Sequence, residues 1–326
     1  MRAIIPVAGV GSRLRPFTFT LPKVLLNVAG KPILGHILDK IIGDGINEAT
    51  IVVGHMSEMI QEFLEATYPD FRVQYVEQEE RMGLGHAIYL SRHTIVDDEP
   101  LLIILGDTIF DVDLGPVLSG DTSALGVKEV DDPRRFGVAV VNDGVITKLV
   151  EKPEQLISNL AVVGLYFLRH PRLLVECLEE IVARDVRTKG EYQLTDALQM
   201  MIERGEKLRT FRVDGWYDCG KPETLLSTNK SLLMKNSTDR RIDGVVIDGP
   251  VYISPSARLR NCVIGPYATV GDHAEISEAV VRDSIIGEHA KVSKVLLDHS
   301  IVGNDSTVVG GFKRMNVGDS SEIESE

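Results

Sequence analysis

The chain has 326 residues, of which 44% are apolar and 25% are charged, and its formal net charge is −13 at pH 7. This length predicts two domains, and the acidic balance argues against general nucleic-acid binding, which needs a basic surface. The longest unbroken aliphatic run, from Leu101 to Leu105, is far shorter than the roughly 20 residues that cross a bilayer, so we expect no membrane span.

The cysteines and the N-terminus both favour a reducing compartment. Cys177, Cys219 and Cys262 are widely spaced and odd in number, so they suggest neither a disulfide framework nor a zinc pattern. Met1 leads directly into a strand-like segment, without the apolar region and small-residue cleavage site that a secretory signal carries. We therefore expect a cytoplasmic protein.

Residues 1 to about 230 alternate between short apolar runs and amphipathic segments. The continuous aliphatic runs predict strands buried on both faces, and spacings of three and four predict helices between them. This alternation indicates an α/β fold with a Rossmann-like, mainly parallel sheet, helices on both faces, and a ligand crevice at the carboxyl ends of the strands. The expected strands cover residues 3–7, 50–53, 73–76 and 101–105, and the expected helices begin near residues 32 and 59.

After about residue 240, helical spacing gives way to a repeat of six residues. In a parallel β-solenoid each repeating aliphatic residue points into the axis, and a small residue four positions later fits a tight corner. The expected inward residues are Ile247, Ile253, Leu259, Ile264, Val270, Ile276, Ile286, Val292, Val302 and Val308. The expected corner residues are Ala257, Ala268, Ala274, Ala290 and Ser306. We therefore divide the chain into residues 1–238, a solenoid over 239–312 and an acidic tail over 313–326.

The loop after the first strand combines glycines with cationic side chains. It reads Ala8-Gly9-Val10-Gly11-Ser12-Arg13, and Pro22-Lys23 follows. Glycines let backbone N–H groups approach a phosphate chain, while Arg13 offers a planar fork for phosphate oxygens and Lys23 a point charge. Leu14 stands where a dinucleotide fingerprint needs its third glycine, and no Walker-type Lys-Ser or Lys-Thr follows a glycine here.

Two aspartates stand in glycine-containing segments far apart in the sequence. Asp107 follows Leu105-Gly106 at the end of a predicted strand, and Asp218 lies in the run Trp216 to Gly220. Mg²⁺ prefers hard oxygen ligands and usually takes one or two carboxylates together with substrate phosphates. A lone aspartate after a strand is a cap or turn residue at least as often, so the pattern alone leaves both interpretations open.

With these motifs, residues 1 to about 230 resemble the sugar nucleotidyltransferase (nucleotide-sugar pyrophosphorylase) family. The resemblance implies an enzyme, with residues 1–238 as its catalytic domain, that joins a sugar 1-phosphate to a nucleoside triphosphate with Mg²⁺ and releases pyrophosphate. Ala8 replaces a glycine usual in thymidylyltransferases, and the Pro6–Gly9 run is more similar to bacterial UTP–glucose-1-phosphate uridylyltransferases. The repeats after residue 238 resemble hexapeptide-repeat, left-handed parallel β-helices.

The resemblance also implies the site residues. Gln78, five residues before Gly83, would read a pyrimidine edge, because an amide can donate and accept at once. We interpret His86 as a helix N-terminal residue. Glu151 would accept hydrogen bonds from sugar hydroxyls, and Lys152 would neutralise the sugar phosphate. The implied nucleotide-binding set is Ala8, Gly9, Gly11, Ser12, Arg13, Lys23, Gln78 and Gly83. The implied sugar-phosphate set is Gly137, Glu151, Lys152, Gly164 and Tyr166, and the implied Mg²⁺ ligands are Asp107 and Asp218.

The expected chemistry is a single in-line displacement with Arg13, Lys23 and Lys152 as catalytic residues. A sugar phosphate is mostly dianionic at neutral pH, because its second pKa is about 6, so no general base is needed. We expect glucose 1-phosphate with UTP or dTTP; the alternatives are a mannose-1-phosphate guanylyltransferase and a non-catalytic regulatory subunit. Acyl transfer on the solenoid is a third alternative, and we expect homo-oligomers through the β-helix.

Overall fold

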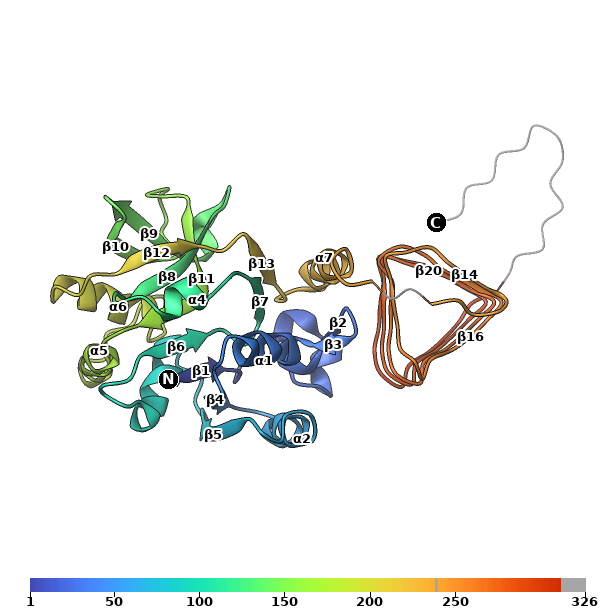
Figure 1. Cartoon of the computed structure of the whole chain (residues 1–326), viewed down its shortest axis with the longest axis horizontal. Helices are drawn as coiled ribbons and strands as arrows, with labels where there is room; N and C mark the ends of the chain where they lie inside the picture. The colour runs from blue at the N-terminus through green and yellow to red at the C-terminus, as the bar shows by residue number, and fades with distance from the viewer. Residues whose placement is uncertain (238–239, 312–326) are drawn as a thin grey trace. The chain divides into compact units, whose positions relative to one another are not determined.

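The computed structural model describes residues 1–237 and 240–311. The chain divides into two compact units, the first made of Met1–Leu26 and Lys31–Leu225 and the second of Asn27–Gly30 and the chain from Leu226 onward (Figure 1). This division falls inside helix α7 (Pro222–Leu233), before the predicted boundary at residue 238. The predicted tail, 313–326, lies outside the described residues.

The first unit is built on a nine-stranded sheet in the order β5-β4-β1-β6-β11-β8-β12-β10-β9. Its first four strands are parallel, and β11 runs antiparallel to both of its neighbours, so the sheet is mixed beyond β6. In sheet order the strands are Arg72–Glu77, Glu48–Val53, Arg2–Pro6, Leu101–Ile104, Leu160–Leu168, Ala124–Glu129, Arg209–Arg212, Val145–Glu151 and Gly137–Asn142.

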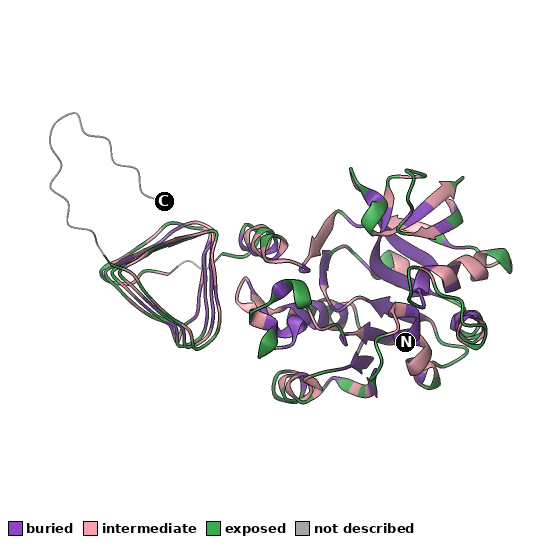
Figure 2. Cartoon of the chain, turned by 180° about the vertical axis from the view of Figure 1, so that it is seen from behind, coloured by how far each residue is buried: buried purple, intermediate pink, exposed green. Residues whose placement is uncertain are grey.

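The strands of this sheet are buried on both faces. Ile4 belongs to the hydrophobic core under α3, α5 and α6, and its neighbour Ile5, which points to the opposite face, is equally inaccessible. Figure 2 shows the buried residues concentrated along these strands. The helices are α1 (Ile33–Gly43), α2 (Ser57–Thr67), α3 (Leu84–Leu90), α4 (Gly115–Leu118), α5 (Pro171–Ala183) and α6 (Leu194–Glu203).

The carboxyl ends of the parallel strands deliver several motifs to one edge of the sheet. The glycine loop follows β1, Gln78 follows β5, and Gly106-Asp107 follows β6. A small antiparallel sheet of β7 (Thr108–Asp111) and β13 (Gly215–Asp218) pairs Thr108 with Asp218 and so brings a distant segment to the same edge. The strands β2 (Asn27–Val28) and β3 (Lys31–Pro32) form a separate short ribbon.

The second unit contains a parallel β-helix with three four-stranded sheets. One sheet holds β14 (Val245–Ile247), β17 (Cys262–Ile264), β20 (Val280–Arg282) and β23 (Leu296–Asp298). The next holds β15 (Tyr252–Ile253), β18 (Thr269–Val270), β21 (Ile285–Ile286) and β24 (Ile301–Val302). The third holds β16 (Arg258–Arg260), β19 (Glu275–Ser277), β22 (Lys291–Ser293) and β25 (Thr307–Val309). The predicted fold class, an α/β unit followed by a hexapeptide-repeat β-helix, is confirmed.

The interior of the β-helix contains the predicted aliphatic residues together with two that the six-residue repeat missed. Val281 is fully buried and Leu297 packs against the same core, yet each lies five residues before the next inward residue, Ile286 or Val302. The predicted small residues Ala268, Ala274 and Ala290 are also fully buried. The spacing of inward residues is therefore six from the second sheet to the third and five from the third to the first, and it changes from six to five between the first sheet and the second.

Non-glycine residues in the left-handed conformation make the corners of the β-helix. Such a backbone costs about 1 kcal/mol or more per residue, and the sheets offset this cost through hydrogen bonds between coils. For example, the backbone N–H of Asp283 donates to Pro266, and that of His289 donates to Asp272, both at 2.8 Å. The corner residues are Asn261, Tyr267, His273, Glu278, Asp283, His289, Lys294, His299 and Asp305. No helix in the described part of the chain is long and apolar enough to cross a bilayer.

Candidate active site

The glycine loop turns sharply after β1 and places two cationic side chains. Gly11 has a φ of +66°, which favours glycine, and a Cβ there would lie 3.0 Å from side-chain carbons of both Lys23 and Thr18. The Thr18 hydroxyl donates to the Gly11 carbonyl at 2.8 Å and holds the turn. Residues 12–14 then form the short helix η1, which carries Arg13. Glycine at position 11 is thus required both by the backbone and by close packing.

Lys23 and Asp107 form an ion pair at the centre of the site. The Lys23 Nζ atom donates to Asp107 Oδ2 at 2.6 Å, and the lysine is buried. Burial acts to raise the pKa of Asp107, but the Lys23 ammonium, as a charge and as a donor, holds that pKa below its ordinary value. Asp107 is therefore a carboxylate throughout the neutral range.

Asp218 lies beside Asp107. The antiparallel pairing of β7 and β13 sets Asp218 opposite Thr108, and the Cys219 N–H donates to the Asp107 carbonyl at 3.1 Å. Burial and then the charge of Asp107 raise the pKa of Asp218, which Lys23 and Arg13 only partly offset. The repulsion between these two neighbouring carboxylates favours the binding of a cation between them.

The arginine of the glycine loop reaches the same place. A Cβ built on Gly220 would lie 3.0 Å from a guanidinium nitrogen of Arg13 and 2.9 Å from Asp218 Oδ1. Gly220 thus stands between the two charged groups, and any side chain there would displace them. The structure therefore brings Arg13, Lys23, Asp107 and Asp218 together.

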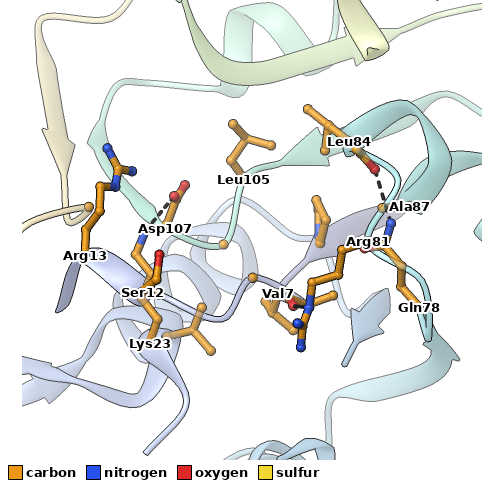
Figure 3. Close-up of a pocket in the computed structure, with 18 of the residues that line it drawn as sticks. Val7, Ser12, Arg13, Lys23, Gln78, Arg81, Leu84, Ala87, Leu105 and Asp107 are labelled. Atoms are coloured by element: carbon orange, nitrogen blue, oxygen red, sulfur yellow. Dashed lines mark hydrogen bonds and ion pairs between the residues drawn. The ribbon is translucent and has the colours of Figure 1, made fainter. Parts of the chain in front are cut away.

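Arg13, Lys23 and Asp107 line a pocket of about 540 Å³ that extends to Gln78. Figure 3 shows Arg13, Lys23 and Asp107 at one end of it and Gln78 at the other. Every residue of the predicted nucleotide-binding set lines this pocket: Ala8, Gly9, Gly11, Ser12, Arg13, Lys23, Gln78 and Gly83. The volume lies in the range of small-molecule sites.

Gln78 is engaged differently from the expectation. Its Nε2 donates to the Gly83 carbonyl at 3.2 Å and lies 3.2 Å from His86 Nδ1. Both contacts engage the amide nitrogen, so only the oxygen of Gln78 remains for a ligand in this structure, and the reading of a base by this amide stays a prediction. His86 lies near the start of α3, as expected, but it also contacts Gln78.

A second pocket of about 520 Å³ adjoins the first. The Glu151 carboxylate accepts from Thr195 Oγ1 at 2.7 Å and lies 3.4 Å from Lys152 Nζ. The two pockets share Arg13 and Asp107 in their walls, so they meet at the charged centre. Asp218 lines this second pocket. So does every residue of the predicted sugar-phosphate set: Gly137, Glu151, Lys152, Gly164 and Tyr166.

Gly164 in β11 lines the second pocket and contacts the segment that leads to Asp107. Gly164 has a φ of +82°, lies in a bulge of the strand, and accepts a hydrogen bond from the Leu105 N–H at 3.0 Å. A Cβ at this position would approach Leu105 side-chain carbons to 2.7 Å. The bulge therefore positions the segment that carries Asp107.

Comparison with known proteins then decides the family. A family model described as nucleotidyl transferase matches residues 2–235. The chain belongs to the nucleotidyl transferase family. A second model, described as GlmU-like C-terminal hexapeptide, matches residues 230–317.

Named relatives of this nucleotidyltransferase come from archaea and bacteria. It is 37% identical over 232 residues to the UTP–glucose-1-phosphate uridylyltransferase AglF of Haloferax volcanii, which covers 68% of this chain and 93% of AglF. It is 30% identical over 320 residues to a glucose-1-phosphate thymidylyltransferase of Streptomyces griseus, covering 88% and 87% of the two chains. A solved UDP-glucose pyrophosphorylase complexed with UDP-glucose superposes with a TM-score of 0.62 at 27% identity, over 72% of this chain and 99% of that one.

Two polar residues of the nucleotidyltransferase pockets lie outside the predicted site sets. Arg81 lines the first pocket and donates from Nε to the Ala8 carbonyl at 3.3 Å. Thr195 lines the second and orients Glu151. The position of Arg81 between Gln78 and Gly83 was the available signal for it, whereas Thr195 reaches Glu151 only through tertiary packing.

Proposed function

We propose that this enzyme transfers the nucleoside monophosphate of UTP or dTTP to a sugar 1-phosphate, with glucose 1-phosphate as the first candidate, and releases pyrophosphate. The observation that carries the proposal is the meeting of two pockets at a centre made of Arg13, Lys23 and Asp107. One pocket has room for a nucleotide and the other for a sugar phosphate. The relatives named above act on these classes of substrate by their names.

The charged side chains and the backbone amides of the first pocket make it the proposed site of the nucleotide. The amides of the glycine loop and the guanidinium of Arg13 would hold phosphate oxygens, as oriented N–H groups and planar cations do. Lys23 would exchange part of its contact with Asp107 for the triphosphate. Gln78 lies at the far end of this pocket and would face the base.

Asp107 and Asp218 fit a magnesium site. Both are hard oxygen donors in adjacent segments, and their mutual repulsion favours a divalent cation. Among the described residues no group of three or more acidic, histidine or cysteine side chains could hold a metal alone, so phosphate oxygens or water would complete the shell. Bound there, Mg²⁺ would supply positive charge to the phosphates of the nucleotide.

The sugar phosphate would lie in the second pocket with Lys152 near its phosphate. The backbone of Lys152 is left-handed, with a φ of 44°, and its N–H donates to the Phe136 carbonyl at 3.0 Å. The chain thus turns directly after Glu151, and the Lys152 ammonium lies 3.4 Å from the Glu151 carboxylate. Thr195 orients this carboxylate through a hydrogen bond. Glu151 would accept hydrogen bonds from sugar hydroxyls while Lys152 neutralises the phosphate.

The reaction would proceed in one displacement. An oxygen of the sugar phosphate forms the new bond to the α-phosphorus of the nucleotide while the bond from that phosphorus to the bridging oxygen breaks. Pyrophosphate leaves with the electron pair, and Arg13 stabilises the charge that develops. Because the nucleophile is already dianionic, alignment and charge neutralisation are the tasks of the protein.

A grid of nucleoside triphosphates against sugar 1-phosphates with Mg²⁺, scored by pyrophosphate release, tests this proposal. We expect the highest kcat/KM for UTP or dTTP with glucose 1-phosphate. Preference for GTP with mannose 1-phosphate would select the guanylyltransferase alternative, and no turnover with any pair would select the regulatory subunit. Release of free thiol from acetyl-CoA with glucosamine 1-phosphate would add acyl transfer to the activities of the chain.

We also propose that the chain self-associates through its β-helix and that it is cytoplasmic. An outward row of aliphatic side chains supports the first part: Val246 and Leu296 are 61% and 65% exposed and line an apolar groove of about 830 Å³ with Val263 and Val280. Sedimentation of the Leu296→Lys variant tests it, because a lysine there should shift an oligomer toward monomer. Val309→Lys, at an exposed residue of a different sheet, is the control.

A further inference from the structure

The amide of Gln78 has a defined orientation in the nucleotide pocket. The Gly83 carbonyl can only accept a hydrogen bond, so the atom facing it at 3.2 Å must be the amide nitrogen. The same nitrogen lies 3.2 Å from His86 Nδ1, which must therefore accept. A neutral imidazole that accepts at Nδ1 carries its proton at Nε2, so the contact defines the tautomer of His86.

The oxygen of the same amide is left for a ligand. Within the described residues no group donates to Gln78 Oε1, and this atom is not among the buried polar atoms that lack a partner. Gln78 lines the nucleotide pocket. Gln78 can therefore accept a hydrogen bond from a ligand in this pocket through Oε1, but it has no free N–H to donate.

We propose that His86 is a positioning residue for base specificity, which fixes Gln78 so that the site selects pyrimidines with a hydrogen on N3. This inference rests on the proposed function and deepens it. Uracil and thymine each carry one edge N–H, at N3, and Gln78 Oε1 is its acceptor. Cytosine has a lone pair at N3, so the same oxygen faces another acceptor and the base is rejected.

The surroundings of His86 hold its ring in place. The side chain is buried, and the rings of Tyr89 and Tyr192 lie with their centroids 6.4 and 6.1 Å away. The Gly85 N–H donates to the Tyr192 carbonyl at 2.8 Å, and a Cβ on Gly83 would lie 2.6 Å from that same carbonyl oxygen. These contacts hold the start of α3 against Tyr192 and keep the histidine beside Gln78.

Burial of the ring favours the neutral form of His86. Burial lowers the pKa of His86; a hydrogen bond to the backbone of Glu80 and the charge of Glu80 oppose this shift, and the charge of Arg187 adds to it. The net pKa lies below its ordinary value. At neutral pH the acceptor at Nδ1 is thus maintained, and acid would convert it into a donor that opposes the amide nitrogen of Gln78.

A matched pair of variants tests the role of His86. In His86→Asn an amide oxygen can take the place of Nδ1, whereas His86→Leu has the same branched shape without an acceptor. The kcat/KM values for UTP and CTP with glucose 1-phosphate are measured by pyrophosphate release at pH 8. We expect His86→Leu to lower the UTP-to-CTP ratio about tenfold, as one lost hydrogen bond does, mainly through KM. His86→Asn should retain most of the ratio.

The pH profile of the wild-type enzyme provides a readout that a purely structural role would not move. The UTP-to-CTP ratio should fall in the wild type as the pH is lowered through the depressed pKa of His86, and it should stay flat in His86→Asn, while phosphate titration cancels in the ratio. An unchanged ratio in folded His86→Leu overturns the role of His86. If that variant does not fold, a flat wild-type profile overturns it. Wild-type enzyme without turnover on any pair would instead refute the proposed function, and binding of UDP against CDP would then still report the base selectivity.

Discussion

Gly220→Ala should damage catalysis while leaving the fold intact. The new Cβ would lie 3.0 Å from the Arg13 guanidinium and 2.9 Å from Asp218 Oδ1, against 3.4 Å or more for ordinary contact. Both atoms are at the ends of side chains, and the φ of Gly220 is outside the left-handed region, so the free energy of unfolding should change by less than about 1 kcal/mol. The two charged groups, however, must each move by about 0.5 Å.

A displacement of this size is large for a transition state. Misplacement by 1 Å can cost about a hundredfold in rate, so about half that distance predicts a loss of about tenfold in kcat. Pyrophosphate release measures kcat, and urea unfolding measures stability. Gly43→Ala is the control, because a Cβ there meets nothing within 4 Å. If Gly220→Ala kept kcat within twofold of the wild type, Arg13 and Asp218 would not be placed for catalysis as we infer.

Four further changes have distinct expected outcomes. Asp107→Ala should lower kcat by about a hundredfold or more at any Mg²⁺ concentration, since it removes the proposed Mg²⁺ ligand and the partner of Lys23; near-normal turnover would contradict this role. Glu151→Gln should raise KM for the sugar 1-phosphate about tenfold and leave KM for the nucleotide unchanged, and equal changes in both would argue against a sugar contact. Gly164→Ala should lower the free energy of unfolding by roughly 1–3 kcal/mol in urea titrations, because φ is +82° and Leu105 is 2.7 Å from the new Cβ. Asp196→Asn should raise Tm at pH 7, because burial raises the pKa of Asp196 and its ionised form therefore destabilises the fold above that pKa. This destabilisation disappears as the pH falls toward 4, so the difference in Tm between the two proteins should shrink there. A difference in Tm that stayed constant with pH would refute this last account.

The part of the site that follows the parallel strands could be predicted from sequence. Gly11, Gln78 and Asp107 come directly after the strands β1, β5 and β6 or in the loops that follow them, and the ends of parallel strands meet at one edge. The neighbourhood of Asp218 could not be derived this way, because it depends on the antiparallel pairing of β7 with β13. Only the family resemblance pointed to it.

Hydrogen bonding within the site was also beyond sequence reasoning. The pattern showed an amide at position 78 and a histidine at position 86, but not that the two would contact each other. Such contacts depend on side-chain directions that backbone periodicity does not specify. For this reason the sequence did not show that the amide nitrogen of Gln78 is engaged by the protein itself.

The β-helix shows where a repeat of this kind can lose residues. Val263 pairs with Val280, 17 positions later, whereas Thr269 pairs with Ile285, only 16 positions later. The missing residue therefore falls at the corner between these strands, and the pairing on either side remains in register. Deletions and insertions in such a chain should be absorbed at corners, so an alignment of related β-helices should be anchored on strand pairs and allowed gaps only at the bends.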